Sequence, residues 1–345
     1  MNKIKFYFIV LMAAFTINSC NDKNDDDIEI TPPRDFSEQY KTDIATIENY
    51  LKTHYFTVLS HPGFPDDQDV TISKIDANQT AIWAYLDSST LPRLTSRKVT
   101  IGAVEYEVYT LVIREGIKGG INLSNQSGGE YPCNVDAVFA GYKGTLMDEA
   151  GTVFDSSNNG QVQYNLDGQS YGGGIGVIRG WAEAFPEFKT GWVSSNDNGT
   201  IRYNDFGVGV MFLPSALGYY NQAQGSIPAY SPLVFSVKLY ALKRLDHDAD
   251  GVPSYLEDVG VGKFHDRYMY YLAPGVSNPD DTDGDGIPDY GDFDDDGDGY
   301  ATRGEVKDKN GNYYEFDKIP DCSGNTTDPN RLKRHLDKNC IKMSQ

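Results

Sequence analysis

Three stretches near the C-terminus repeat one pattern of acids and glycine within twelve residues. The windows begin at Asp246, Asp281 and Asp294, and each has acids at positions 1, 3, 5 and 12 and glycine at position 6. Alternating carboxylates can converge on one hard cation, and the glycine permits the sharp turn that this needs. The acids in the pattern, with one more acid at position 9 of the second window, are Asp246, Asp248, Asp250, Glu257, Asp281, Asp283, Asp285, Asp289, Asp292, Asp294, Asp296, Asp298 and Glu305. We predict structural Ca²⁺ sites here; the alternative is a solvated acidic linker.

The net charge of the chain, −20, is concentrated in the same region. Residues 246–305 contain 17 acidic and 3 basic residues, so 17 − 3 = 14 net negative charges lie there. Without a cation the carboxylates would repel one another and extend the chain, so calcium is expected to order it. The charge also repels nucleic-acid phosphates and anionic lipid headgroups, which excludes both as main partners.

The first twenty residues are typical of a targeting segment. Lys3 and Lys5 precede an apolar run from Phe6 to Ile17, which is too short for a good membrane span. Cys20 follows and resembles the lipidated cysteine of bacterial lipoproteins, although Asn18 is not the usual small residue. We expect a cell-envelope protein held at the outer membrane by its lipid alone; the alternative is a plain cleaved signal.

The three remaining cysteines suggest one disulfide. Cys322 and Cys340 flank a polar loop and could pair in an oxidising compartment. Closing that loop would stabilise the fold by roughly 3 kcal/mol. Cys133 is then expected to be a small buried residue. His335 lacks a second histidine or cysteine at metal spacing and is expected on the surface.

Periodicity predicts a helix before any strand. Apolar residues recur at three- and four-residue spacing from Asp35 to Leu59, and Asp35 or Ser37 could cap the start. The following residues, 60–104, are mixed, with strand-like runs at Val70–Ile75 and Ala81–Leu86. We assign this part no function.

The region from Val104 to Leu245 is rich in strand patterns separated by glycine-rich turns. A short helical stretch, Gly180–Phe188, lies in its middle. Many strands around one short helix predict an α+β fold, in which an antiparallel half-barrel wraps the helix. The predicted strands are Glu107–Arg114, Asp136–Tyr142, Gln161–Leu166, Gly207–Leu213 and Leu233–Leu242.

A series of strings in this region resembles the FKBP family in order and approximate spacing. They are Val138–Leu146, Val153–Ser157, Val177–Trp181, Leu213–Tyr219, Ser226–Pro228 and Leu233–Val237. The resemblance implies an FKBP-type peptidyl-prolyl cis-trans isomerase domain over residues 105–243. Its substrates would be proline-containing polypeptides.

Such catalysis needs neither a nucleophile nor a cofactor. Rotation about an X–Pro bond crosses a barrier of about 18–20 kcal/mol because it breaks amide resonance. An apolar pocket that favours the twisted amide lowers that barrier. The resemblance implies that Trp181 forms the floor of this pocket and that its walls are Tyr142, Phe154 and Phe235. The rim would be formed by Val177 and Ile178, and the Ile178 N–H would donate to the substrate. Tyr219 would donate to the substrate carbonyl, Asp155 would lie beside the twisted amide, and Ile227 would close one side.

Four features depart from the family pattern. Val162 stands where the family has an aromatic wall, and Tyr220 stands where it usually has glycine. Gly172–Gly174 is expected to be an insertion, and residues 193–206 lengthen another loop. Two functions therefore stay open, a folding catalyst for exported proteins and a non-catalytic binder of proline peptides.

The acidic windows also resemble known repeats. Pro253 and Pro288 at position 8 make them similar to thrombospondin type 3 or dockerin-like repeats, and less similar to paired EF-hands. The expected organisation is a signal at 1–20, a tether at 21–35, an N-terminal segment at 36–104, the FKBP-like domain at 105–243, calcium repeats at 244–305 and a tail at 306–345.

Overall fold

The computed structural model describes residues 32–119, 129–170, 172–196, 198–258, 267–269 and 278–340. The expected signal, Cys20 and most of the expected tether lie outside these residues. The chain divides into residues 1–34 and 35–345, and every described helix and strand belongs to the second unit. Within the described ranges, no helix is both long and apolar enough to cross a membrane.

The N-terminal helix is present but shorter than predicted. Helix α2 spans Phe36–Thr53, and the Asp35 carboxylate caps it by accepting from the N–H groups of Ser37 (2.9 Å) and Glu38 (3.1 Å). The prediction of helix up to Leu59 is wrong, because strand β1, His54–Val58, follows the helix directly. Its aromatic and β-branched residues favour a strand over a helix.

Strand β1 pairs with strand β2, Val70–Lys74, in an antiparallel hairpin. The second run, predicted as a strand, is instead the 3-10 helix η1, Ile82–Tyr85. Ile82 is fully buried against Ile47 and Leu51 of α2, so packing rather than β-propensity decides its conformation.

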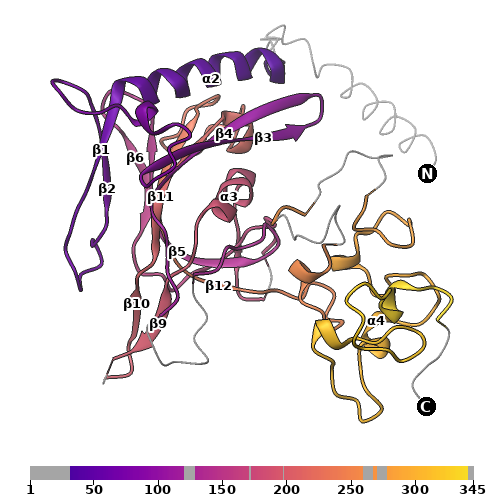
Figure 1. The fold of residues 1–345 in the computed structure, drawn as a ribbon. Coiled ribbons are helices and arrows are strands. Elements are labelled where there is room, and N and C mark those ends of the chain that lie inside the picture. The colour runs from indigo at the N-terminus through magenta and orange to yellow at the C-terminus, as the bar shows by residue number, and fades with distance from the viewer. Residues whose placement is uncertain are drawn as a thin grey trace, which may run out of the picture. The chain divides into compact units, whose positions relative to one another are not determined.

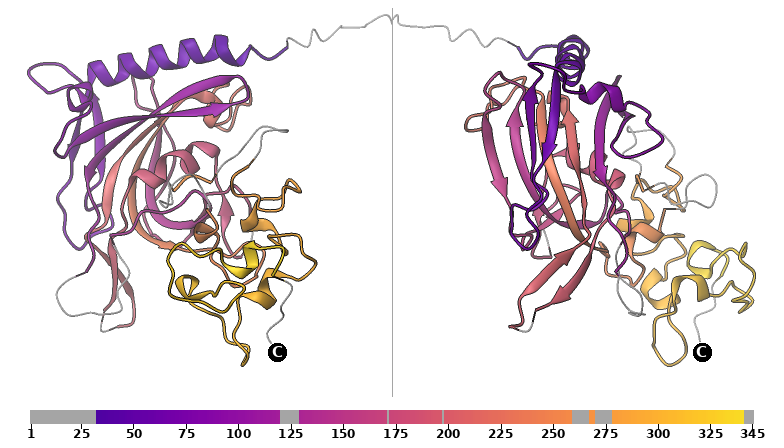
Figure 2. Two further views of the ribbon diagram at one scale, coloured as in Figure 1. Left: turned by 45° about the vertical axis from the view of Figure 1, so that its right-hand side comes forward. Right: turned by 60° about the vertical axis from the view of Figure 1, so that its left-hand side comes forward.

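The main sheet follows the order β3-β4-β11-β12-β5-β7-β8, with β6 paired to β5. Only the β7–β8 pair is parallel among these described strands. The strands are β3 Arg93–Ile101, β4 Val104–Arg114, β5 Ala137–Leu146, β6 Val153–Ser157, β7 Gln163–Asn165, β8 Ile175–Gly176, β11 Gly207–Leu213 and β12 Leu233–Lys243. A separate hairpin, β9 Trp192–Ser195 with β10 Ile201–Asn204, projects beyond this sheet (Figures 1 and 2).

Strand β3 was not predicted, and it changes where the sheet begins. It pairs with β4 along its whole length, from Arg93 opposite Val112 to Ile101 opposite Val104. The expected boundary between residues 104 and 105 therefore falls inside a hairpin. The sheet extends into the segment to which the sequence assigned no role.

Each face of the sheet carries its own hydrophobic core. Helix α3, Arg179–Ala184, and the turn η2, Phe185–Glu187, pack on the side to which Met211 and Leu213 point. Helix α2 and η1 cover the other side, to which Val210 and Phe212 point. Alternate residues of β11 thus enter opposite cores, as strand geometry requires. Figure 1 shows α3 enclosed by the curved sheet and α2 on its outside. The predicted α+β architecture, with a mainly antiparallel sheet around a short helix, is confirmed.

The C-terminal part is built from turns and short helices around a small core. Val252, Val306 and Ile319 form this core, and Cys322 is bonded to Cys340, the pairing that the sequence allowed. Cys133 is buried and free, as predicted. The short elements are η4 Ser254–Leu256, η5 Asp289–Gly291, α4 Thr302–Glu305, η6 Phe316–Lys318 and η7 Arg334–Leu336.

The expectation that His335 lies on the surface is wrong, since the residue is only 1% exposed. Burial first, and the charges of Lys333 and Arg334 next, lower its pKa to about 3. In the unfolded chain the imidazole takes up a proton near its ordinary pKa of 6.5. The neutral side chain therefore stabilises the fold fully above that pH, and this contribution is lost as the pH falls from 6.5 toward 3.

We expect His335→Phe to flatten the pH dependence of stability on the acid side. Phenylalanine keeps a ring in the buried site but cannot bind a proton in the unfolded chain. Urea denaturation between pH 7 and 4.5, at saturating calcium, measures the free energy of unfolding of both proteins. Equal slopes for wild type and variant would show that His335 does not couple folding to protons.

Candidate functional site

A cavity of about 580 Å³ opens at the end of α3, on the concave side of the sheet. It is lined by every residue that the family resemblance placed in a proline pocket. These are Tyr142, Phe154, Asp155, Val177, Ile178, Trp181, Tyr219, Ile227 and Phe235. The structure adds Tyr164, Ile175, Gly176 and Gln224, which the sequence did not indicate.

Trp181 forms the base of this cavity and is held by four aromatic rings, of which Phe185 lies 5.1 Å away, edge-on, and the other three line the cavity. The ring centroids of Tyr142, Tyr164 and Phe235 lie 5.0, 5.3 and 5.4 Å from the indole, all edge-on. Such edge-to-face contacts fix the indole plane. Its N–H is buried and has no hydrogen-bond acceptor among the described residues.

Gly180, the residue before Trp181, must lack a side chain so that α3 can pack against β11. A Cβ on Gly180 would lie 2.4 Å from Leu213 Cδ1 of β11. Glycine therefore lets α3 pack closely against the central strand, which brings the indole of Trp181 to the cavity floor.

The rim of the cavity holds three oxygen-bearing side chains. The Tyr142 hydroxyl donates to Asp155 Oδ2 at 2.6 Å, and the Ser156 N–H donates to Asp155 Oδ1 at 2.8 Å. Burial, then the bond to Asp155, raises the pKa of Tyr142. Burial, then the charge of Asp155, raises the pKa of Tyr219. Both phenols thus keep their protons at neutral pH, so Tyr219 can donate a hydrogen bond.

Two of the expected departures from the family pattern look different in the structure. Val162 packs against the core and does not line the cavity; Tyr164, two residues along, provides the aromatic wall. Tyr220 does not enter the cavity either. Its ring stacks on Phe36 of α2 at 4.3 Å, and its φ of +51° is the left-handed conformation that glycine usually adopts.

Helix α2 supports one side of the cavity. Asp43 is buried, and its Oδ2 accepts from both the N–H (2.8 Å) and the hydroxyl (2.6 Å) of Ser215. Ser215 begins the turn η3, Ser215–Leu217, which leads directly to Tyr219. The N-terminal segment therefore positions a cavity residue, although its sequence gave no sign of this.

Replacing Asp43 is expected to lower both stability and any activity of the cavity. Asp43→Ala removes three hydrogen bonds to a charged acceptor, two from Ser215 and one from Gln39 Nε2. It leaves two donors of Ser215 buried, at a cost of roughly 2–4 kcal/mol. Lys52→Ala, on the exposed surface of the same helix, is the matched control. Urea denaturation measures the loss. If Asp43→Ala behaves like Lys52→Ala, α2 does not hold this turn.

The three acidic windows share one hydrogen-bonding scheme. The carboxylate at position 1 accepts from the N–H of the position-6 glycine, as in Asp246 to Gly251 at 3.1 Å and Asp294 to Gly299 at 2.9 Å. The acids at positions 3 and 5 accept from N–H groups two residues later. The position-6 glycines all have φ between +92° and +102°. Most of these acids thus use one oxygen locally, whereas Asp281 uses both, because its Oδ1 also accepts from the Gly284 N–H at 2.8 Å.

The structure brings most, but not all, of the predicted ligands together. Their oxygens fall into three groups within 4.8 Å: Asp248, Asp250 and Glu257 with Asp295; Asp281, Asp283 and Asp285; and Asp294, Asp296 and Asp298. Asp246, Asp292 and Glu305 lie outside these groups. Asp289 also lies outside, because both its oxygens accept from Thr282, at 2.8 and 2.7 Å.

These groups fit a hard cation. Several buried carboxylate oxygens have no hydrogen-bond partner among the described residues, including Asp250 Oδ2, Asp296 Oδ2 and both oxygens of Glu257. Burial, then the charges of neighbouring acids, raises the pKa of Glu257 to about 11 and that of Glu305 to about 8. Unpaired buried carboxylates are unfavourable unless a proton or a cation neutralises them. All the available ligand atoms are oxygen, which suits Ca²⁺.

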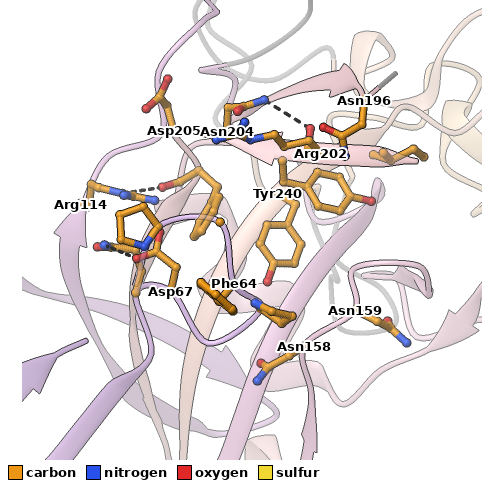
Figure 3. A pocket seen from close by; sticks show the side chains of 17 residues that line it. Phe64, Asp67, Arg114, Asn158, Asn159, Asn196, Arg202, Asn204, Asp205 and Tyr240 are labelled. Atoms are coloured by element: carbon orange, nitrogen blue, oxygen red, sulfur yellow. Dashed lines mark hydrogen bonds between the residues drawn. The ribbon is translucent and has the colours of Figure 1, made fainter. Parts of the chain in front are cut away.

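A second hollow, of about 890 Å³, lies on the opposite face of the sheet (Figure 3). The β1–β2 loop, the β9–β10 hairpin and Tyr240 line it. Three of its charged side chains have partners: Arg114 Nε donates to the Phe206 carbonyl, Asp205 accepts from the Trp192 indole, and Asp67 accepts from the His61 N–H. The cavity above Trp181 is the better candidate, because the residues selected by the FKBP resemblance line it.

Known proteins resemble two separate parts of the chain. The family described as BamM C-terminal matches residues 247–329, which include the first acidic window from its second residue onward and all of the two later ones. The FKBP-type peptidyl-prolyl cis-trans isomerase FkpA of Escherichia coli, strain K12, is 34% identical over 117 residues. That alignment covers 33% of this chain and 34% of FkpA, and FkpA of E. coli O157:H7 matches equally well. The chain thus spans about a third of the length of these relatives.

Solved structures resemble the chain only loosely. The crystal structure of E. coli FkpA shares 28% identity with a TM-score of 0.27, covering 39% of this chain and 48% of FkpA. A peptidyl-prolyl isomerase of Pseudomonas syringae shares 16% identity with a TM-score of 0.32, covering 62% of this chain and all of that one. The three FKBP domains of wheat FKBP73 share 20% identity with a TM-score of 0.28, over 42% and 48% of the two chains.

Proposed function

We propose that the cavity floored by Trp181 is a peptidyl-prolyl cis-trans isomerase site, in a protein that assists the folding of exported polypeptides. The observation that carries this proposal is the enclosure of one apolar cavity by the nine side chains that the FKBP resemblance selects. The sequence similarity to FkpA supports it, since that relative is an FKBP-type isomerase by name.

The geometry suggests how rotation would be eased. A proline ring would pack on the Trp181 indole between the Tyr142 and Phe235 rings. In the twisted amide the carbonyl is no longer conjugated with the nitrogen, so the carbonyl depends less on hydration by water. A water-poor cleft therefore favours the twisted amide over the planar ground state. The Tyr219 phenol, protonated at neutral pH, would donate to a substrate carbonyl at the rim. Asp155, already bonded to the Tyr142 hydroxyl, would interact with the twisted amide.

We further propose that the acidic windows bind Ca²⁺ in a structural role and that catalysis needs no cofactor. The unpartnered buried oxygens support the first statement. We place the protein in the cell envelope, held at the outer membrane through a lipid on Cys20. The signal-like N-terminus and the match to the BamM C-terminal family support this location.

An isomerisation assay on an Ala-Leu-Pro-type peptide tests the main proposal. Uncatalysed exchange takes tens to hundreds of seconds, so micromolar protein should shorten it visibly. An unchanged rate at micromolar protein would remove the proposal. The alternative, a non-catalytic FKBP-fold binding protein stiffened by calcium, predicts no acceleration together with capture of a proline-containing polypeptide.

A further inference from the structure

Asp295 belongs to the third acidic window by sequence, but its carboxylate lies with the acids of the first window. Asp295 is at position 2 of the third window, where the repeat pattern expects no ligand. Its carboxylate does not face Asp294, Asp296 and Asp298, its neighbours in the chain. An oxygen of Asp295 instead lies within 4.8 Å of oxygens of Asp248, Asp250 and Glu257, all from the first window.

The Asp295 carboxylate is directed into this group of acids. Asp295 is 1% exposed, and neither of its carboxylate oxygens has a hydrogen-bond partner among the described residues. Its own N–H donates to the fully buried Thr302 hydroxyl oxygen at 3.1 Å, which fixes the main chain at this point. A buried carboxylate held in such a position is costly unless a cation compensates it.

The other three members of the group also present spare oxygens. Glu257 has two, and Asp248 and Asp250 have one each, because their remaining oxygens accept from main-chain N–H groups. No ion pair of the described residues involves any of the four acids. Calcium takes six to eight oxygen ligands, which these side chains largely supply.

We propose that Asp248, Asp250, Glu257 and Asp295 form one composite Ca²⁺ site that ties the first acidic window to the third. This inference rests on the proposed calcium-binding role of the windows. Since Asp294 and Asp296 face their own group while Asp295 faces the first window, the third window serves two ions. Calcium at the composite site therefore clamps residues 246–257 against residues 294–305, two segments distant in sequence.

Calcium titration calorimetry on the calcium-stripped full chain tests the proposal, with isosteric variants. Asp295→Asn should weaken one class of sites by about tenfold or more, because ligand charge sets affinity. Asp248→Asn should weaken the same class, and the double variant should add little to either single change. Asp283→Asn is the matched control in the second window. It should weaken another class and combine additively with Asp295→Asn.

A second readout is amide hydrogen exchange in residues 246–257. Calcium near the wild-type dissociation constant of the site should slow it in wild type and Asp283→Asn and much less in Asp295→Asn. If Asp248→Asn weakens binding while Asp295→Asn titrates like wild type, the composite site is wrong and the calcium role stands. If calcium binds to none of these proteins, the calcium role itself fails. The absence of calcium binding is also the result expected if the four acids share a proton in place of calcium.

Discussion

Isomerase activity is expected to fall on the order of 100-fold when Trp181 is replaced by leucine, a loss of about 2.7 kcal/mol in transition-state stabilisation. Leucine removes the flat floor on which a proline ring would pack and leaves the edges of Tyr142, Tyr164 and Phe235 facing a void. The value of kcat/KM for a proline peptide measures the effect.

Two further variants separate loss of the site from loss of the fold. Trp192→Leu makes the same substitution outside the cavity, on the β9–β10 hairpin, and should leave kcat/KM unchanged. Asp155→Val disturbs the core little, since Asp155 is exposed at the rim, and should still lower activity by removing the partner of the Tyr142 hydroxyl. Full activity in both Trp181→Leu and Asp155→Val would place the reaction elsewhere.

Removal of calcium is expected to lower the thermal midpoint of the C-terminal part and to loosen it. Each site stabilises the folded form by roughly 1.4 kcal/mol at free calcium ten times its dissociation constant, so several sites add to a large effect. Without the cation the buried acids must take up protons or move apart. Calorimetry of the full chain with calcium and with a chelator measures the change.

The response of the two parts should differ. The β-rich part, with its two hydrophobic cores, should keep its transition, because among the described residues no member of these cores belongs to one of the three acidic groups. Magnesium at equal concentration is the control, since it binds poorly to sites built for seven or eight oxygens. Superimposable traces with and without chelator would contradict a structural role for calcium.

Much of the sheet and of the cavity could be predicted from the sequence. Strands such as Gly207–Leu213 show local patterning and turn signals, and the FKBP-like strings selected residues that line one cavity. The secondary-structure predictions were wrong where tertiary packing overrides local conformational preference. Ile82 is an example, because it packs into the core beneath α2 from a 3-10 helix and not from a strand. Strand β3 was missed because it contains many polar residues, so its sequence shows no clear alternation of apolar and polar positions.

The sequence by itself determined the features that depend on spacing within a few residues. These are the carboxylate turns of each acidic window and the Asp35 cap. Only the tertiary structure decided that Tyr164 provides the wall, that Asp43 holds the turn before Tyr219, and that Asp295 joins the first window. Local hydrogen bonds and periodicity depend on residues that are neighbours in the sequence. The contacts of Tyr164, Asp43 and Asp295 instead join segments that meet only once the sheet register and the path of the chain are fixed.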